Sequence, residues 1–350
     1  MFISFCVYVL VCLLGIRFYF GNEGNREYLT VEQTQAVKGL FILLVFFSHI
    51  QGYVTVTDRK DLLCGWLIGI VGQGMVTLFM FYSGYGIMES VCKKGDGYVS
   101  TMPVKRIFST WFRFACAVTL FVAVALWNGQ ELTLSRIGLA YIGWESLGNS
   151  NWYIFAVLVL YTITYLAFRL TGTKHLLRSN IVVLLGSVMY ISLLSFRGIK
   201  GMWWYDTVLC YGFGMAWSLF IRTPGERYLW KWIPWGIALI GSMGVFCWAT
   251  ISDWTAINQL IRNLAFAVAI VLLTMRISFR NKILRWCGKH LFPLYILQRI
   301  PMIIFSDLGI QEYSFGVYIV LCLVVTLLMV YPFEWVTDWL WKKVETCFKV

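Results

Sequence analysis

Hydrophobic residues run in long continuous stretches along this chain instead of alternating with polar ones. A helical run of about 18 to 25 apolar residues is long enough to cross the ~30 Å hydrocarbon core of a bilayer. Lipid offers no partners to backbone polar groups, so these runs predict a bundle of transmembrane helices. Eleven spans are expected, at residues 1–20, 37–57, 62–90, 107–127, 150–168, 180–196, 203–221, 230–250, 257–276, 288–306 and 314–338.

The first run lacks a basic amino-terminal region and a small-residue cleavage site, so we interpret it as a retained helix and not as a signal peptide. Composition supports the membrane class, because 59% of residues are hydrophobic and 13% are charged. A soluble domain carries about 25% charged residues.

Basic residues are distributed unevenly between the gaps that separate the spans. Alternate gaps hold 21 of the 29 lysines and arginines, the other gaps hold six, and Arg113 and Arg299 lie within spans. Positive charge collects on the cytoplasmic side of membrane proteins, so the N-terminus is expected outside and the C-terminus in the cytoplasm. The net charge of +12 therefore requires no nucleic-acid partner, and it favours contact with anionic membrane lipid.

The ten cysteines are scattered, without a CxxC pair or a Cys/His cluster, and predict neither a disulfide framework nor a metal site. Hydrolase elbows, phosphate-binding loops and dinucleotide fingerprints are not found in a credible context. Ionisable residues within the spans remain, and each is costly enough in lipid to be a functional hypothesis.

The stretch KGLFILLVFFSHI joins Lys38 to His49 across eleven residues. At 100° and 1.5 Å per residue, the two side chains share one helix face, and His49 lies roughly 16 Å from Lys38, near the membrane midplane. Histidine at this depth suits acid–base work, because its pKa is close to neutrality. The alternative is that His49 is a buried structural residue, hydrogen-bonded to a neighbouring helix, and that Lys38 only anchors the helix at the membrane surface.

Further polar and small residues occur in four other spans. In residues 62–90, small residues allow close helix approach, and Gly84 and Gly86 also let the backbone approach a ligand; the small residues are Gly72, Gly74, Ser83, Gly84 and Gly86. Arg113 lies about two turns beyond the basic pair Lys105–Arg106, and arginine forks suit phosphate groups. The fifth span opens with NSNWYIF, which is either an acceptor site or an interfacial Trp152–Tyr153 pair.

In LRWCGKHLFPLYILQRI, Gln298 and Arg299 lie about 14 Å beyond Lys289, a depth comparable to that of His49. His290 is expected at the membrane interface.

Taken together, these segments resemble the acyltransferase-3 family of integral membrane acyltransferases. The resemblance covers about residues 30 to 340 and rests on five motifs in order: Lys38–Gly39 with His49, the run Phe79 to Tyr85, Lys105–Arg106, Trp152–Tyr153, and Cys287–Gly288 followed by Tyr295 to Gln298. Three positions depart from the family pattern. Lys38 replaces a frequent arginine, Ser109 replaces an arginine, and Gln298 replaces a frequent histidine.

The resemblance implies a ten-helix core with one added N-terminal helix. It divides the chain into an N-terminal helix and loop (1–29), an acyltransferase-3-like membrane domain (30–341) and a short cytoplasmic tail (342–350). It places the protein in the cytoplasmic (inner) cell membrane as a multi-pass protein.

The resemblance also implies an O-acyltransferase that moves an acyl group, most simply acetyl, from cytoplasmic acyl-coenzyme A to a hydroxyl of an extracytoplasmic glycan or polysaccharide. His49 is the expected base or acyl relay, and Arg299 is expected to stabilise negative charge. Lys38, Arg106 and Arg113 are expected to hold the donor's phosphates. The expected substrate channel is lined by Ser83, Gly84, Trp152, Tyr153, Tyr295 and Gln298.

Acyl-coenzyme A acts here as a donor substrate, and no permanently bound cofactor is expected. Two other functions stay open at this point: a transporter of a glycolipid or small anion, and a non-catalytic component of a polysaccharide assembly complex. The identity of the acceptor and the oligomeric state are not specified by the sequence.

Overall fold

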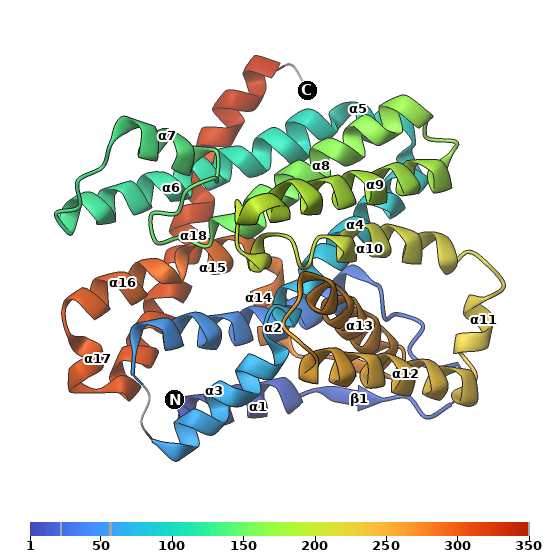
Figure 1. The fold of residues 1–350 in the computed structure, drawn as a ribbon, viewed down its shortest axis with the longest axis horizontal. Coiled ribbons are helices and arrows are strands. Elements are labelled where there is room, and N and C mark those ends of the chain that lie inside the picture. The colour runs from blue at the N-terminus through green and yellow to red at the C-terminus, as the bar shows by residue number, and fades with distance from the viewer. Residues whose placement is uncertain (22, 56–57, 349–350) are drawn as a thin grey trace.

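The protein is a helical bundle, shown in Figure 1 as a computed structural model that describes residues 1–21, 23–55 and 58–348. It is 79% helical, and eight helical segments of the described chain are long and apolar enough to cross a membrane. The predicted class, an all-α multi-pass membrane protein, is therefore confirmed. A single two-stranded sheet, β1–β2, accompanies the helices in the described residues.

The first part of the chain forms α1 (Phe2–Leu13), β1 (Ile16–Phe18), α2 (Val31–Ile50), η1 (Gln51–Tyr53), α3 (Arg59–Val71), α4 (Gly74–Lys94), α5 (Asp96–Met102), the π-helical turn η2 (Pro103–Phe108), α6 (Ser109–Trp127), α7 (Leu134–Tyr141), α8 (Asn151–Thr171) and α9 (Leu176–Ser195). The second part forms η3 (Phe196–Gly198), η4 (Met202–Trp204), α10 (Leu209–Phe220), α11 (Glu226–Leu229), α12 (Trp232–Ile251), α13 (Ala256–Thr274), β2 (Ile277–Phe279), α14 (Lys282–Lys289), α15 (Leu291–Leu297), α16 (Arg299–Asp307), α17 (Ile310–Tyr313) and α18 (Phe315–Phe348).

Three of the eleven expected spans contain only short helices. The segment 1–20 holds the 12-residue α1, 203–221 holds the 12-residue α10, and 288–306 is divided between α15 and α16. Twelve helical residues rise only about 18 Å, which is less than the hydrocarbon thickness. The count of eleven spans and the orientation of the bundle therefore stay predictions.

The expected span at 62–90 falls within one apolar segment long enough to cross a membrane, Arg59–Lys94, but its helix is interrupted between α3 and α4. Gly72 caps α3 with φ of 50°, a left-handed conformation that glycine adopts without a Cβ penalty. The Arg262 guanidinium, on α13, donates to the carbonyl oxygens of Gly69 and Ile70 in the last turn of α3. Arg262 is thus a buried helix cap, because it satisfies carbonyls that the helix itself leaves free.

Two pairs of helices pack backbone against backbone through reciprocal glycines. A Cβ on Gly39 of α2 would overlap the Leu284 carbonyl of α14, and one on Gly288 of α14 would overlap the Gln35 carbonyl of α2. Gly84 of α4 meets the Tyr211 carbonyl of α10 in the same way. Glycines that allow such approach are typical of membrane helix interfaces, and here they bind α2 to α14 and α4 to α10.

The N-terminal segment is tied to distant parts of the chain. β1 pairs antiparallel with β2, so that Arg17 lies opposite Ser278, and the amino group of Met1 forms an ion pair with Asp61 at 3.3 Å. In Figure 1, α7 and α17 lie on one side of the bundle and α11 on the other.

Candidate active site

His49 lies in the last turn of α2, where its Nε2 is 3.4 Å from the Oγ of Ser150. Ser150 immediately precedes α8, so two helices distant in sequence bring this pair together. The Nδ1 atom of His49 is buried and makes no hydrogen bond within the described residues. One ring nitrogen therefore faces a hydroxyl, and the other faces no protein partner.

The helix bounds change the expected position of His49. The predicted span continued to residue 57, but α2 begins at Val31 and ends at Ile50. His49 is therefore at one end of its helix, and the expected midplane depth does not follow from these bounds. Lys38 does share its face, because both residues lie in the uninterrupted α2, about 16 Å apart.

Two tyrosines form an aromatic wall beside the histidine. The Tyr295 ring, on α15, lies 6.3 Å from the His49 ring and 5.1 Å from the ring of Tyr153, on α8, between centroids. The Tyr295 hydroxyl is buried and has no hydrogen-bond partner that meets standard distance and angle limits within the described residues. The side chain of Ser150 is the polar group nearby. The predicted channel residue Tyr295 thus lies next to His49, and Tyr153 lies behind it against the Tyr295 ring.

Arg299 is held near the same point by an aromatic partner. Its Nε donates to the hydroxyl of Tyr53 at 3.0 Å, and its guanidinium lies 5.6 Å from the centroid of that ring. Tyr53 lies four residues after His49, and α16 packs against both α2 and η1, so Arg299 lies at the same end of α2 as His49. Gln298 is buried, and its amide donates to the carbonyl of Tyr295 at 3.2 Å, at the junction of α15 and α16.

A polar cavity of about 530 Å³ adjoins this group. Tyr53, the partner of Arg299, lines it together with Leu147, Gly148, Asn128, Asp307, Gln130 and Arg136. The Asn128 amide donates to the Asp307 carboxylate, which joins the end of α6 to the end of α16. The cavity therefore offers carboxylate, amide and guanidinium groups beside the predicted catalytic residues.

The three basic residues expected to bind phosphate occupy different environments. Lys38 is half-buried and makes no ion pair or hydrogen bond within the described residues. Arg106 is exposed, and its Nε donates to the hydroxyl of Tyr98 at 3.0 Å. Arg113 forms an ion pair with Asp338 on α18 at 2.9 Å. Among the described residues, Lys38 and Arg106 therefore have no carboxylate partner, and Lys38 alone of the three also makes no hydrogen bond.

The remaining predicted channel residues divide between packing and polar contact. Gly84 packs against the backbone of α10, as described above, so it serves close helix approach and not contact with a ligand. Ser83 exchanges a hydrogen bond with the Tyr161 hydroxyl at 2.9 Å, and Trp152 is half-buried with its ring against Tyr153.

His290, expected at the membrane interface, packs inside the protein, and its depth in the membrane stays a prediction. Its ring is buried, and Nδ1 lies 2.8 Å from a carboxylate oxygen of Glu334 on α18. Among the described residues, no group of three or more histidine, cysteine, aspartate or glutamate side chains is placed to hold a metal ion.

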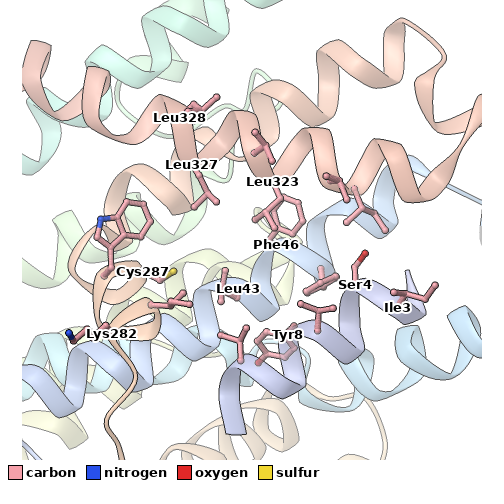
Figure 2. A pocket seen from close by; sticks show the side chains of 18 of the residues that line it. Ile3, Ser4, Tyr8, Leu43, Phe46, Lys282, Cys287, Leu323, Leu327 and Leu328 are labelled. Atoms are coloured by element: carbon pink, nitrogen blue, oxygen red, sulfur yellow. The ribbon is translucent and has the colours of Figure 1, made fainter. Parts of the chain in front are cut away.

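A larger apolar groove of about 850 Å³ lies away from these residues. Figure 2 shows it between α1, α2, α14 and α18, with Ile3, Tyr8, Phe46 and Leu323 among its lining side chains. None of the predicted site residues lines it, so it forms no part of the candidate active site.

Sequence reasoning did not select Ser150, Tyr53 or the Asn128–Asp307 pair. The stretch NSNWYIF contains Ser150, but the choice fell on the aromatic residues that follow it. A serine at the N-cap of a long helix was the available signal, although that signal usually indicates helix capping alone.

Comparison with known proteins agrees with this architecture. The sequence profile of one family, described as an acyltransferase domain, matches residues 33–335. No curated protein and no solved structure matches the chain. The fold and the profile together define a multi-pass membrane protein with an acyltransferase domain. The chain belongs to the acyltransferase-3 family, which confirms the resemblance found in the sequence, and it is accordingly a membrane acyltransferase.

Proposed function

We propose that this protein is an O-acyltransferase of the cytoplasmic membrane that transfers an acetyl group from acetyl-coenzyme A to a hydroxyl of an extracytoplasmic glycan. The observation that carries this proposal is the convergence of His49, Tyr295 and Arg299 beside a polar cavity. Membrane lipid surrounds the protein, and nucleic acid has no role.

His49 acts as the base in this proposal. Its Nε2 accepts the proton of the attacking hydroxyl, and the bond from that oxygen to the thioester carbon forms as the carbon–sulfur bond breaks. The proton then passes from Nε2 to the leaving thiolate. General base catalysis of this kind contributes about 10²–10⁴-fold to the rate.

Arg299 and Tyr295 would stabilise the oxyanion that develops on the thioester carbonyl. Positioned donors in a site that excludes water stabilise such charge better than water does. The bond to Tyr53 supports this role, because it restricts the rotation of the Arg299 guanidinium.

Donor binding is assigned chiefly to Lys38, with Arg106 as a second basic residue. A half-buried ammonium group without a carboxylate partner is unfavourable until an anion joins it, and the phosphates of coenzyme A supply that anion. Arg113 already pairs with Asp338, so its contribution requires release from that carboxylate.

Acceptor binding is assigned to the polar cavity. Carboxylate and amide groups such as those of Asp307, Asn128 and Gln130 match ligands that carry many hydroxyl groups, because carboxylates accept hydrogen bonds and amides both accept and donate them. A glycan fits this chemistry.

Binding of coenzyme A to the purified, full-length protein tests the proposal. Isothermal titration should show saturable binding that weakens at least tenfold in Lys38→Ala, because the variant removes the unpaired positive charge. Lys174→Ala, which removes an exposed lysine from the predicted cytoplasmic loop, is the matched control and should bind as the native protein does.

Mass spectrometry of surface glycans from cells with and without the protein then identifies the acyl group and its acceptor. A protein that binds no coenzyme A and leaves these glycans unchanged would contradict the proposed function and favour a transporter.

A further inference from the structure

Ser150 occupies the N-cap position of α8 but does not cap the helix. Its side chain makes no hydrogen bond to the first turn, and its backbone has φ of −88° and ψ of 70°. N-cap serines ordinarily accept a hydrogen bond from a backbone N–H of that turn. Here the hydroxyl instead faces His49 Nε2 at 3.4 Å, with the Tyr295 hydroxyl beside it.

The loop before α8 is built to hold this serine in place. The Ser146 hydroxyl donates to the carbonyl of Asn149 at 2.7 Å, and the Asn151 amide donates to the carbonyl of Gly143 at 2.6 Å. The ammonium group of Lys200 donates to the Trp144 carbonyl at 2.8 Å and lies over the Trp144 ring. Ser150 is only 4% exposed, so its hydroxyl is both buried and fixed.

The lysine contact is an unusual one for a charged residue. Burial lowers the pKa of Lys200, and the negative charge of Glu145 opposes that change. The aromatic and carbonyl contacts of the ammonium group therefore connect the 196–204 segment to the loop that carries Ser150.

The start of α8 provides an environment that favours negative charge. A helix of 21 residues directs its free N–H groups and the positive end of its dipole toward its first turn. The Ser150 side chain does not occupy those donors. An oxyanion formed at Ser150 would therefore have backbone donors from α8 and the Tyr295 hydroxyl nearby.

We propose that Ser150 is a further catalytic residue, which takes the acyl group from the donor and then passes it to the acceptor. This inference rests on the proposed function and deepens it, because it replaces one direct transfer by two. A serine hydroxyl beside a histidine nitrogen is the arrangement of nucleophile and base in covalent catalysis, and it is often looser before the substrate binds.

Both steps balance in atoms and charge. In the first, Ser150 Oγ bonds to the thioester carbon, the carbon–sulfur bond breaks, and the serine proton passes through His49 Nε2 to the leaving thiolate. In the second, an acceptor oxygen bonds to the acyl carbon, the bond to Ser150 Oγ breaks, and the acceptor proton passes through Nε2 to that oxygen.

The position of Ser150 gives a reason for two steps. Gly148 lines the polar cavity and is only two residues from Ser150, whereas Lys38 lies about three turns of α2 away from His49. A donor held at Lys38 and an acceptor held in the cavity would reach Ser150 from different directions. With the acyl group stored on Ser150, the two substrates need not be bound at the same time.

An exchange assay tests the inference without an acceptor. Purified full-length protein is incubated with acetyl-coenzyme A and radiolabelled free coenzyme A, and the label entering acetyl-coenzyme A is measured. An acyl-serine predicts exchange, because the first step is then reversible on its own, and direct transfer predicts none. Exchange should fall by about 100-fold or more in Ser150→Ala and in His49→Ala, since each removes a group needed for the first step.

Two further variants separate chemistry from folding. Ser187→Ala removes a buried serine whose hydroxyl bonds only its own helix, and it should exchange at the native rate. Ser150→Cys keeps a nucleophile and should restore exchange that Ser150→Ala lacks, which a merely structural hydroxyl would not require. Mass spectrometry of the tryptic peptide spanning residues 137–169 should locate the acetyl group on Ser150.

The outcomes distinguish this inference from the proposed function. Acylation of surface glycans without coenzyme A exchange, an acetyl group found on His49, or full exchange by Ser150→Ala would overturn the role of Ser150 and leave the acyltransferase intact. Absence of coenzyme A binding, exchange and glycan acylation together would overturn both.

Discussion

Replacing Arg299 by glutamine is the most direct test of how the site stabilises charge. The side chain is half-buried, and its Nε donates at 3.0 Å to the hydroxyl of Tyr53, which lies four residues after His49. Glutamine removes the charge while it keeps a polar side chain, so the helix junction beside Gln298 should persist. The expected loss is therefore in the reaction and not in folding.

The magnitude follows from the role assigned to the guanidinium. Removal of one donor to a developing oxyanion costs about 2.7–4 kcal/mol, or about 10²–10³-fold in kcat. Tyr53→Phe leaves the charge but removes the acceptor of the Nε hydrogen bond. A hydrogen bond to a charged group contributes about 1.5–3 kcal/mol, which corresponds to a loss of about 10- to 150-fold at most if all of it positions Arg299.

The assay measures acetyl transfer to surface glycans and binding of coenzyme A on the same preparations. Both variants should bind coenzyme A with native affinity, because Lys38 rather than Arg299 is assigned to the donor's phosphates. Arg299→Gln with more than half of the native transfer rate would refute charge stabilisation by this residue. Weakened coenzyme A binding in Arg299→Gln would instead assign Arg299 to binding of the donor.

The remaining predictions concern packing and donor binding. Gly84→Ala should destabilise the detergent-solubilised protein by about 1–3 kcal/mol in thermal unfolding, because a Cβ there overlaps the backbone of α10. Gly86→Ala in the same helix meets open space and should unfold at or slightly above the native temperature, and equal effects of the two would contradict the packing described here. Asp338→Asn should tighten coenzyme A binding by about 1.4- to fivefold, since an exposed ion pair of about 0.2–1 kcal/mol no longer holds Arg113. Unchanged affinity for coenzyme A in Asp338→Asn would show that Arg113 does not contribute to donor binding.

Local patterns along the chain were enough to predict the class and part of the site. Runs of apolar residues indicate helices that cross lipid because the backbone must satisfy its own hydrogen bonds there. The shared face of Lys38 and His49 follows from helix periodicity alone, which operates within one continuous helix. Tyr153, Tyr295 and Arg299 were selected by their order in motifs of a family, and the structure places them together around His49.

The contacts between helices could not be predicted in the same way. Ser150 is 101 residues from His49, and Asp338 is 225 residues from Arg113. Such pairs depend on which helix faces meet and at what depth, and helix periodicity contains no information about either.

The break at Gly72 shows the same limit of local patterns. The run of apolar residues continues through it, so hydropathy predicts one helix at 62–90. The chain ends α3 there because glycine permits the turn and because Arg262, 190 positions later in sequence, supplies donors to the free carbonyls.

The sequence by itself therefore determined a helical membrane acyltransferase with a lysine and a histidine on one helix face. Tertiary structure alone decided that a serine from another helix stands against the histidine, that Lys38 stays unpaired while Arg113 does not, and that a polar cavity adjoins Arg299. The physical reason is that hydropathy and periodicity act between neighbours in the chain, whereas hydrogen bonds and ion pairs between helices form only where close packing brings the side chains within about 3 Å.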